Sequence, residues 1–327
     1  MAPEVFRSPV AFWIKAYLET RRAAGNEVFY TARILRKLDA FLMAELSPGQ
    51  PITREIAEKW IANMQHLAAG TRINQIVVLR QFCLYLSNFD PRTCIIFQIG
   101  LPFRRHPSPH IYSLAEVRQI LAAARKIGPS GSFRPTVIST LIGFLYATGV
   151  RVGEALRLRL SEVDLKQRLI EIRKGKFKKS RYVPISCSTA EHLATYLRLR
   201  QQAGFSITPA SFVFVTQRGC GYRHPAFTTI FLGILRSIGL RGPKGQRGPR
   251  IHDLRHTFAV NRLLAWYRQG GHLGAKLPIL STYMGHCTVT GTQIYLQATA
   301  ELLESAGRRF HDHFAIPPFR KNIHGKN

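Results

Sequence analysis

Arginine, lysine, histidine and tyrosine residues recur in four short motifs in the second part of the sequence. A guanidinium offers a planar fork of donors to phosphate oxygens, an imidazole can donate or accept a proton, and a phenol can act as a nucleophile. Together these groups are suited to phosphodiester transfer without a metal ion. The motifs are, in chain order, Ala147-Thr148-Gly149-Val150-Arg151-Val152-Gly153-Glu154, then Gly175-Lys176 ahead of Val183-Pro184, then His252-Asp253-Leu254-Arg255-His256-Thr257, and finally Gly285-His286 followed nine residues later by Tyr295.

The charge of the chain indicates the kind of partner that these motifs meet. The sequence has 47 Lys and Arg against 18 Asp and Glu, a formal charge of +29. Residues 1–100 carry 12 basic and 8 acidic residues, whereas residues 101–327 carry 35 and 10. Such an excess favours a polyanion, either nucleic acid or an anionic membrane surface, and argues against a freely diffusing enzyme of cationic metabolites. We expect the main footprint of the partner on the second part of the chain.

Length and composition limit the class of protein further. The 327 residues predict two or three domains, and a hydrophobic fraction of 46% is sufficient for packed cores. We expect no membrane span, since no apolar run approaches the roughly 18 residues that a span requires, and no secretory signal in Met1–Val10. Five scattered cysteines, without paired spacing, predict a cytoplasmic protein without a disulfide framework. They are Cys83, Cys94, Cys187, Cys220 and Cys287.

The elements around the motifs fall into two groups. Residues 1–100 predict an all-helical domain, because four segments have apolar residues at helical spacing. These segments are Pro9–Thr20, Tyr30–Met43, Arg54–His66 with Thr53 as its cap, and Thr71–Leu86. Residues 101–112 predict a basic linker, in which Pro102, Pro107 and Pro109 prevent a helix.

The second predicted domain covers residues 113–327 and mixes helices with a small sheet. Ser113 and Glu116 form a capping box that opens a helix ending near Lys126. Further helices are predicted over 136–147, 152–159, 189–202, 255–267, from Pro278 onward, and over 300–311, with strands at 169–172 and 182–185. Six of the nine residues between these strands, Arg173–Arg181, are Lys or Arg, and Arg241–Arg250 is a basic loop rich in Gly and Pro.

The four motifs, in this order and spacing, resemble those of the tyrosine recombinases, the phage-integrase family. The resemblance covers residues from about Ser113 to Phe310, and the segments Leu277–His286 and Thr299–Leu303 are similar to recombinases carried by transposons. It implies a mainly α fold with a small β-sheet: an all-helical core-binding (SAM-like) domain followed by a mixed α/β catalytic domain. It also implies a site-specific recombinase or integrase that cleaves and rejoins DNA through a 3′-phosphotyrosyl intermediate, without metal, ATP or other cofactor, in integration or transposition.

The resemblance also assigns roles to residues. Tyr295 matches the nucleophile, Arg151 and Arg255 the two arginines that stabilise the transition state, and Lys176 the general acid for the leaving 5′-oxygen. His252 and His286 match the two histidine positions, and Glu154 matches an acidic position that orients Arg151 or supports its turn. Lysines at 174, 178 and 179 surround Lys176, so an alignment shift of two residues stays possible there. Tyr283 is an alternative tyrosine, but it precedes His286.

Double-stranded DNA is therefore the expected partner, bound by a homotetramer with one protomer for each cleaved strand, alone or together with sister recombinases. We expect the remaining basic residues to contact phosphates along the DNA backbone. They lie in the linker, in the connection between the two strands and in the Gly/Pro-rich loop. This DNA-contact set is Arg104, Arg105, Arg173, Lys174, Lys178, Lys179, Arg181, Lys244, Arg247 and Arg250. The final helix, 300–311, is expected either to fold onto its own domain or to dock on a neighbouring protomer.

Other interpretations remain at this stage. A type IB topoisomerase would use the same residue types as a monomer, and a DNA-binding regulator could keep the fold without catalysis. A metal-dependent transposase would need clustered carboxylates to hold its metal ions, and the second domain shows no obvious triad of acidic residues. His252, His256 and Cys287 could bind a metal ion, but no further ligands stand at zinc spacing, so no metal site is expected.

Overall fold

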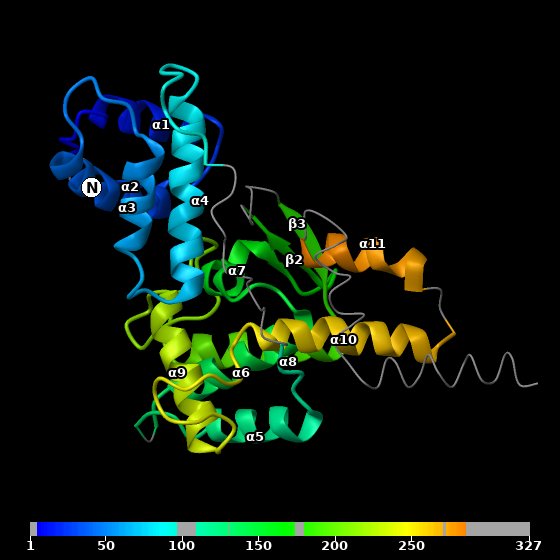
Figure 1. Ribbon diagram of the computed structural model, residues 1–327. Helices are drawn as coiled ribbons and strands as arrows, with labels where there is room; N and C mark the ends of the chain where they lie inside the picture. Colours follow the sequence, from blue (N-terminus) through cyan, green and yellow to red (C-terminus); the bar gives the residue numbers. More distant parts are fainter. Residues whose placement is uncertain (1–4, 97–108, 130, 174–179, 271–272, 286–327) are drawn as a thin grey trace, which may run out of the picture. The chain divides into compact units, whose positions relative to one another are not determined.

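The computed structural model describes residues 5–96, 109–129, 131–173, 180–270 and 273–285 (Figure 1). The chain divides into two compact units, Met1–Pro107 and Ser108–Asn327. Within the described residues helices dominate, and a single small sheet has three strands. This architecture confirms the predicted fold class. None of the described helices is long and apolar enough to cross a membrane.

The first unit is built from four helices. They are α1 (Ala11–Ala23), α2 (Phe29–Glu45), α3 (Arg54–Ala62) and α4 (Ala69–Leu86). The Thr53 hydroxyl accepts a hydrogen bond from the Ile56 N–H at 3.4 Å and caps α3 as predicted. The expected start of α4 after Gly70 was wrong, because the helix already begins at Ala69 and includes this glycine.

Apolar residues at helical spacing form the core of the first unit. Leu35, Leu38 and Leu42 on α2 are fully or almost fully buried, as are Leu79 and Phe82 on α4. Residues three and four apart lie on one face of a helix, so this spacing turns a stripe of each helix inward. Helices α2 and α4 contact one another, and these buried residues belong to one apolar cluster.

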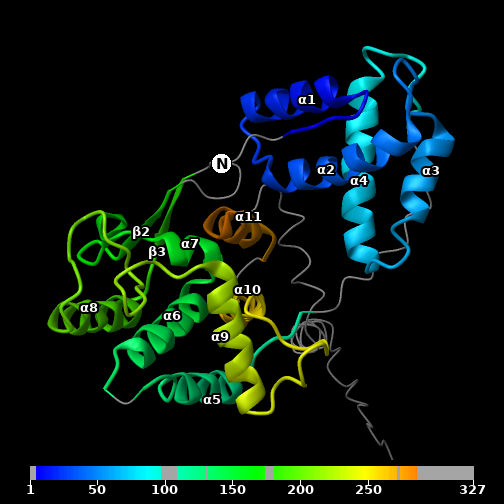
Figure 2. The ribbon, with the colours of Figure 1, turned by 90° about the vertical axis from the view of Figure 1, so that its left-hand side faces the viewer.

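The second unit begins with α5 (Leu114–Ala124), followed by α6 (Arg134–Thr148) and the short α7 (Val152–Arg157). The predicted capping box at α5 is formed: Glu116 N–H donates to Ser113 Oγ at 3.2 Å, and Ser113 N–H donates to Glu116 Oε2 at 2.7 Å. Helix α6 packs against α5, α8 and α10, and Figure 2 shows α5, α6 and α8 next to one another. Ile138, Leu141 and Ile142 of α6 are completely buried, so this helix lies at the centre of the core.

The sheet consists of three antiparallel strands in the order β1-β2-β3. They are β1 (Val163–Asp164), β2 (Leu169–Ile172) and β3 (Arg181–Pro184), and Ile170 pairs with Val183. Side chains alternate between the two faces of a strand. In β3, Val183 is fully buried and Tyr182 is exposed, which places Arg181 on the same inward face as Val183.

The remaining helices complete the second unit. They are α8 (Cys187–Gln202), α9 (His224–Ser237), α10 (Asp253–Arg268) and α11 (Leu273–Met284). Helix α9 was not predicted. The expected helix start at Pro278 was also wrong, because Pro278 lies inside α11. Proline has no N–H to donate to the carbonyl four residues earlier, so α11 continues through this position without that hydrogen bond.

Helices α10 and α11 share a smaller apolar cluster that includes Phe258, Leu263, Leu280 and Met284. Helix α11 also packs against β3 (Figure 1). The end of α11 is thereby held next to both α10 and the sheet. These are the elements that carry Arg255 and Arg181.

Candidate active site

The turn between α6 and α7 positions Arg151. Gly149 ends α6 in the left-handed conformation, with a φ of 62°, which is readily adopted only by glycine. A Cβ at this residue would lie 2.3 Å from Cδ1 of Phe258 on α10, so glycine is also required for space. The turn makes Arg151 the residue before α7, where its side chain is 23% exposed.

Glu154 on α7 is the buried carboxylate of the site, with only 3% of its side chain exposed. Its Oε1 accepts from Arg151 Nη1 at 2.9 Å and from Arg181 Nη1 at 3.0 Å. Its Oε2 accepts from the Arg151 N–H at 3.0 Å and from Arg181 Nη2 at 2.8 Å. Burial alone would raise the pKa of this carboxyl, but the contacts with Arg181 and then with Arg151 outweigh it and lower the pKa to about 2. Glu154 is therefore an anion that bridges two arginines at neutral pH.

Arg255 projects from α10 and is 3% exposed. Its Nη1 donates to the carbonyl of Gly149 at 2.7 Å, and its Nη2 donates to the carbonyl of Met284 at 2.6 Å. One guanidinium thus joins the turn that carries Arg151 to the end of α11.

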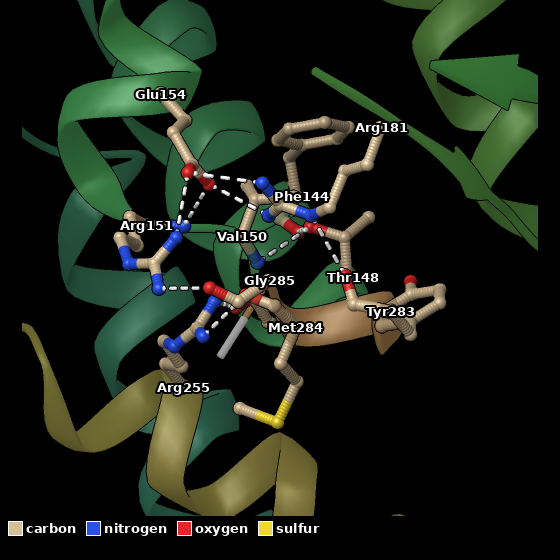
Figure 3. A network of polar contacts seen from close by, with 11 residues as sticks. Phe144, Thr148, Val150, Arg151, Glu154, Arg181, Arg255, Tyr283, Met284 and Gly285 are labelled. Atoms are coloured by element: carbon tan, nitrogen blue, oxygen red, sulfur yellow. Dashed lines mark hydrogen bonds and ion pairs between the residues drawn. The ribbon is translucent and has the colours of Figure 1, made fainter. Parts of the chain in front are cut away.

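Three arginines meet three successive backbone carbonyls at the C-terminal end of α11 (Figure 3). Arg181 Nε donates to Tyr283 O at 2.8 Å, Arg255 Nη2 to Met284 O at 2.6 Å, and Arg151 Nη2 to Gly285 O at 2.6 Å. The last carbonyls of a helix have no partner within it, and they form the negative end of the helix dipole. The end of α11 therefore attracts positive charge and brings together three arginines from separate elements.

Two histidines lie at the start of α10. The rings of His252 and His256 pack edge to face, with centroids 4.8 Å apart. The His252 side chain keeps contact with solvent, yet the protein around its ring, followed by His256 and Arg255, lowers its pKa to about 4. Burial likewise lowers the pKa of His256. Both rings are therefore neutral at pH 7, with one nitrogen able to donate and the other able to accept.

The beginning of α10 is fastened to its surroundings by Asp253 and Thr257. Asp253 Oδ2 accepts from the Arg250 N–H at 2.7 Å, and its Oδ1 accepts from Arg250 Nη2 at 3.0 Å. Thr257 Oγ1 accepts from the Tyr112 N–H at 2.9 Å and donates to Asp253 O at 2.8 Å. These contacts fix the helix that presents His252 and Arg255.

The structure brings together Arg151, Glu154, Arg255 and, close by in the chain, His252. The other residues for which catalytic roles were predicted, Lys176, His286 and Tyr295, lie outside the described residues. So do Arg104, Arg105, Lys174, Lys178 and Lys179 of the DNA-contact set, together with Cys287 and the predicted helix 300–311.

The described members of the DNA-contact set fall into two kinds. Lys244, Arg247, Arg250 and Arg173 have exposed side chains, although Arg173 Nη2 also donates to Glu171 Oε2 at 2.8 Å. Arg181 is different, because its side chain is only 11% exposed and its guanidinium is bound to Glu154 and Tyr283 O. This inward arrangement departs from the DNA contact expected of Arg181.

The role of Arg181 and the three carbonyl acceptors were missed by the sequence analysis. A signal for Arg181 existed: it stands two residues before the buried Val183, so strand alternation turns both side chains to the same face. The carbonyls carried no such signal. Among the described residues there is also no cluster of three or more His, Cys, Asp or Glu able to hold a metal ion.

Comparison with known proteins places this site in a family. The sequence profile described as the phage integrase family matches residues 113–301. The chain belongs to the phage integrase family. It is thus a tyrosine recombinase, an enzyme that cleaves and rejoins DNA strands, and the function predicted from the four motifs is confirmed at this level.

Relatives of this tyrosine recombinase include bacterial proteins of similar length. A putative integrase/recombinase of Sinorhizobium fredii, y4rB, is 36% identical over 300 residues, which is 90% of this chain and 95% of that protein. The tyrosine recombinase XerD of Bifidobacterium longum is 25% identical over 302 residues, covering 89% of this chain and 92% of its own length.

A solved structure has the same fold. The Tn1549 transposon integrase in complex with transposon right end DNA aligns with a TM-score of 0.67 at 18% identity, and the alignment covers 93% of this chain and 99% of that one. The shared fold extends over both units of the chain.

Proposed function

We propose that this recombinase cuts DNA with Tyr295 as the nucleophile and with Arg151 and Arg255 as the groups that stabilise the transition state, in the integration or transposition of a mobile element. One observation carries the proposal: Arg151 and Arg255, from motifs about 100 residues apart in the sequence, donate to the adjacent carbonyls of Gly285 and Met284. His286 follows Gly285 directly in the chain, and Tyr295 lies nine residues after His286. The transposon integrase that shares the fold supports the biological role.

The proposed reaction consists of two transfers at phosphorus. The Tyr295 phenol gives its proton to a neutral histidine of the site, and its oxygen attacks the phosphorus and forms the 3′-phosphotyrosyl bond. The bond to the 5′-oxygen breaks, and Lys176 gives this oxygen a proton; the second transfer reverses both proton movements. A 5′-hydroxyl from the partner strand then attacks the same phosphorus and releases the tyrosine. The phosphodiester energy is kept in the covalent intermediate, so the reaction needs neither ATP nor a metal ion.

The described residues provide the electrostatics for these steps. Negative charge accumulates on the nonbridging phosphate oxygens in the transition state, and prearranged guanidinium donors stabilise it. Glu154 fixes the Nη1 side of Arg151. His252, neutral at pH 7 because its pKa is about 4, can donate a hydrogen bond from one ring nitrogen.

A nicked suicide substrate tests the nucleophile. We expect the protein to form a covalent adduct with the DNA without added metal and Tyr295→Phe to form none. Tyr283→Phe is the matched control, because the Tyr283 hydroxyl donates to Pro184 O at 3.3 Å within the protein and burial raises its pKa to about 12. An adduct that persists in Tyr295→Phe and disappears in Tyr283→Phe would overturn the assignment.

The assembly that we propose is a homotetramer on two paired DNA sites, with one protomer for each cleaved strand and a sister recombinase as a possible partner. The proposed location is the cytoplasm, at the nucleoid. The exposed Arg173, Lys244, Arg247 and Arg250 are proposed to follow the DNA backbone, together with the linker and strand-connection residues named above. Sedimentation of the protein on synapsed sites tests the stoichiometry, and complexes with two protomers in total would contradict it.

A further inference from the structure

Arg181 is the first residue of β3, and all three nitrogens of its guanidinium donate hydrogen bonds within the protein. Its Nη1 and Nη2 donate in parallel to the two oxygens of Glu154, at 3.0 and 2.8 Å, and its Nε donates to Tyr283 O at 2.8 Å. Three elements, β3, α7 and α11, are therefore joined by one side chain that is 11% exposed. A parallel pair of contacts fixes the plane of the carboxylate as well as its distance.

We propose that Arg181 is a positioning residue for DNA cleavage, which orients Arg151 through Glu154 and holds the end of α11 through Tyr283 O. The proposal rests on the proposed function, because it assigns Arg151 to the scissile phosphate. It also replaces the DNA contact expected of Arg181 with a contact inside the protein.

The first link runs through the carboxylate. Glu154 Oε1 is shared by Nη1 of Arg181 and Nη1 of Arg151. The two contacts from Arg181 hold the plane of the Glu154 carboxylate in place. The carboxylate in turn fixes the orientation of the Arg151 guanidinium. Without Arg181, the buried Glu154 anion has only Arg151 as its cation, and we expect Arg151 to turn toward it and away from the phosphate position.

The second link runs through the end of α11. Gly285 adopts a φ of 67°, and a Cβ at this residue would lie 3.0 Å from Cζ and Nη1 of Arg181. The guanidinium therefore lies directly against the backbone of Gly285, while the carbonyl of the same residue accepts from Arg151. Arg181, Glu154, Arg151 and residues 283–285 form a closed ring of contacts, in which moving one member moves the others (Figure 3).

The position of Arg181 predicts a loss in the cleavage step and little change in DNA binding. All three nitrogens of the Arg181 guanidinium donate to protein acceptors and its side chain is 11% exposed, so its removal takes little cationic surface from the DNA. A misplacement of a catalytic group by about 1 Å can cost on the order of 100-fold in rate. We expect the single-turnover cleavage rate of Arg181→Gln at saturating DNA to fall by about 10- to 100-fold.

The experiment compares five proteins on the suicide substrate: wild type, Arg181→Gln, Glu154→Gln, the double variant, and Arg198→Gln. Arg198 on α8 is exposed, and its Nη2 donates to Thr195 Oγ1 at 3.3 Å on the same helix, so its substitution controls for the loss of one positive charge. We expect the Kd for one DNA site to change less than about twofold in Arg181→Gln. We also expect a strongly non-additive pair: Arg181→Gln should cost far less cleavage rate in the Glu154→Gln background, because the carboxylate that transmits the effect is already gone.

Arg181→Lys separates geometry from charge. Lysine keeps the charge but cannot make the parallel pair of contacts, so we expect it to lose nearly as much cleavage as Arg181→Gln. Wild-type cleavage in Arg181→Lys would overturn the proposal, and so would additive losses in the double variant. An Arg181→Gln protein that binds DNA weakly but cleaves normally at saturation would restore the DNA-contact role.

Failure of the proposed function gives a different result. In that case the wild-type protein forms no adduct, whatever residue stands at position 181. The contact between Arg181 and Glu154 is then still tested by the melting temperatures of the same single and double variants, where absence of coupling would overturn the first link of the proposal.

Discussion

Gly149→Ala tests whether the turn after α6 depends on close approach as well as on backbone conformation. Gly149 has a φ of 62°, and alanine in the left-handed region costs roughly 1–2 kcal/mol. The new methyl group would lie 2.3 Å from Cδ1 and 2.7 Å from Cγ of Phe258, which is 8% exposed and stacked on Tyr283. Overpacking of this kind costs typically about 1–3 kcal/mol. We expect Gly149→Ala to lower the free energy of unfolding by about 2–5 kcal/mol.

Gly204→Ala is the matched control. Gly204 has a φ of 80°, and nothing lies within 4 Å of the position that a Cβ would occupy. This variant has only the backbone cost, so the difference between the two variants isolates the clash with Phe258. In a domain of this size about 1 kcal/mol corresponds to roughly 2–4 °C, and we expect Gly149→Ala to melt about 2–12 °C below Gly204→Ala. Equal melting temperatures in differential scanning calorimetry would refute the close-approach argument.

Two further predictions concern buried polar groups. The pKa of Glu154 is lowered from 4.5 to about 2, so its stabilising contribution of about 3 kcal/mol is complete above pH 4.5 and is lost as the pH falls toward 2. In urea denaturation, the difference in free energy of unfolding between wild type and Glu154→Gln should therefore narrow over this pH range. A difference that stays constant would contradict the lowered pKa of Glu154. Thr257→Val keeps the shape of a fully buried residue but leaves the Tyr112 N–H without its acceptor, and we expect urea denaturation to show a loss of about 1–3 kcal/mol; a loss below 0.5 kcal/mol would mean that this N–H finds another acceptor.

Local signals allowed much of the fold to be predicted. Ser113 and Glu116 act on one another three residues apart, and Thr53 caps the helix that begins at the next residue, so both features are visible in a few letters of sequence. The unpredicted helix α9 also had a signal, because Phe227, Phe231, Ile234 and Leu235 are buried at helical spacing. In that case the pattern was present and was not used.

The sequence predicted the side chains of the site but not the backbone groups that they contact. Arg151, Glu154, Arg255 and His252 stand in motifs, and their residue types indicate their chemistry. Their acceptors on α11 are backbone carbonyls, which every residue has, so the motif at Gly285-His286 marked the segment without indicating that the carbonyls of residues 283–285 accept from arginines. Only the packing of α11 against α10 and β3 selects these carbonyls.

The arrangement at the end of α11 also has a consequence for protein synthesis. The contacts from Arg151 to Gly285 and from Arg181 to Tyr283 connect residues 134 and 102 positions apart, and in each the acceptor is the later residue. A growing chain that has not reached residue 285 lacks these acceptors on α11, so Arg151 and Arg181 are held only by Glu154. Incomplete translation products and fragments cut before this point are therefore expected to bind DNA without breaking it. The completion of the site therefore depends on a segment near the end of the chain, which is among the last to be synthesised.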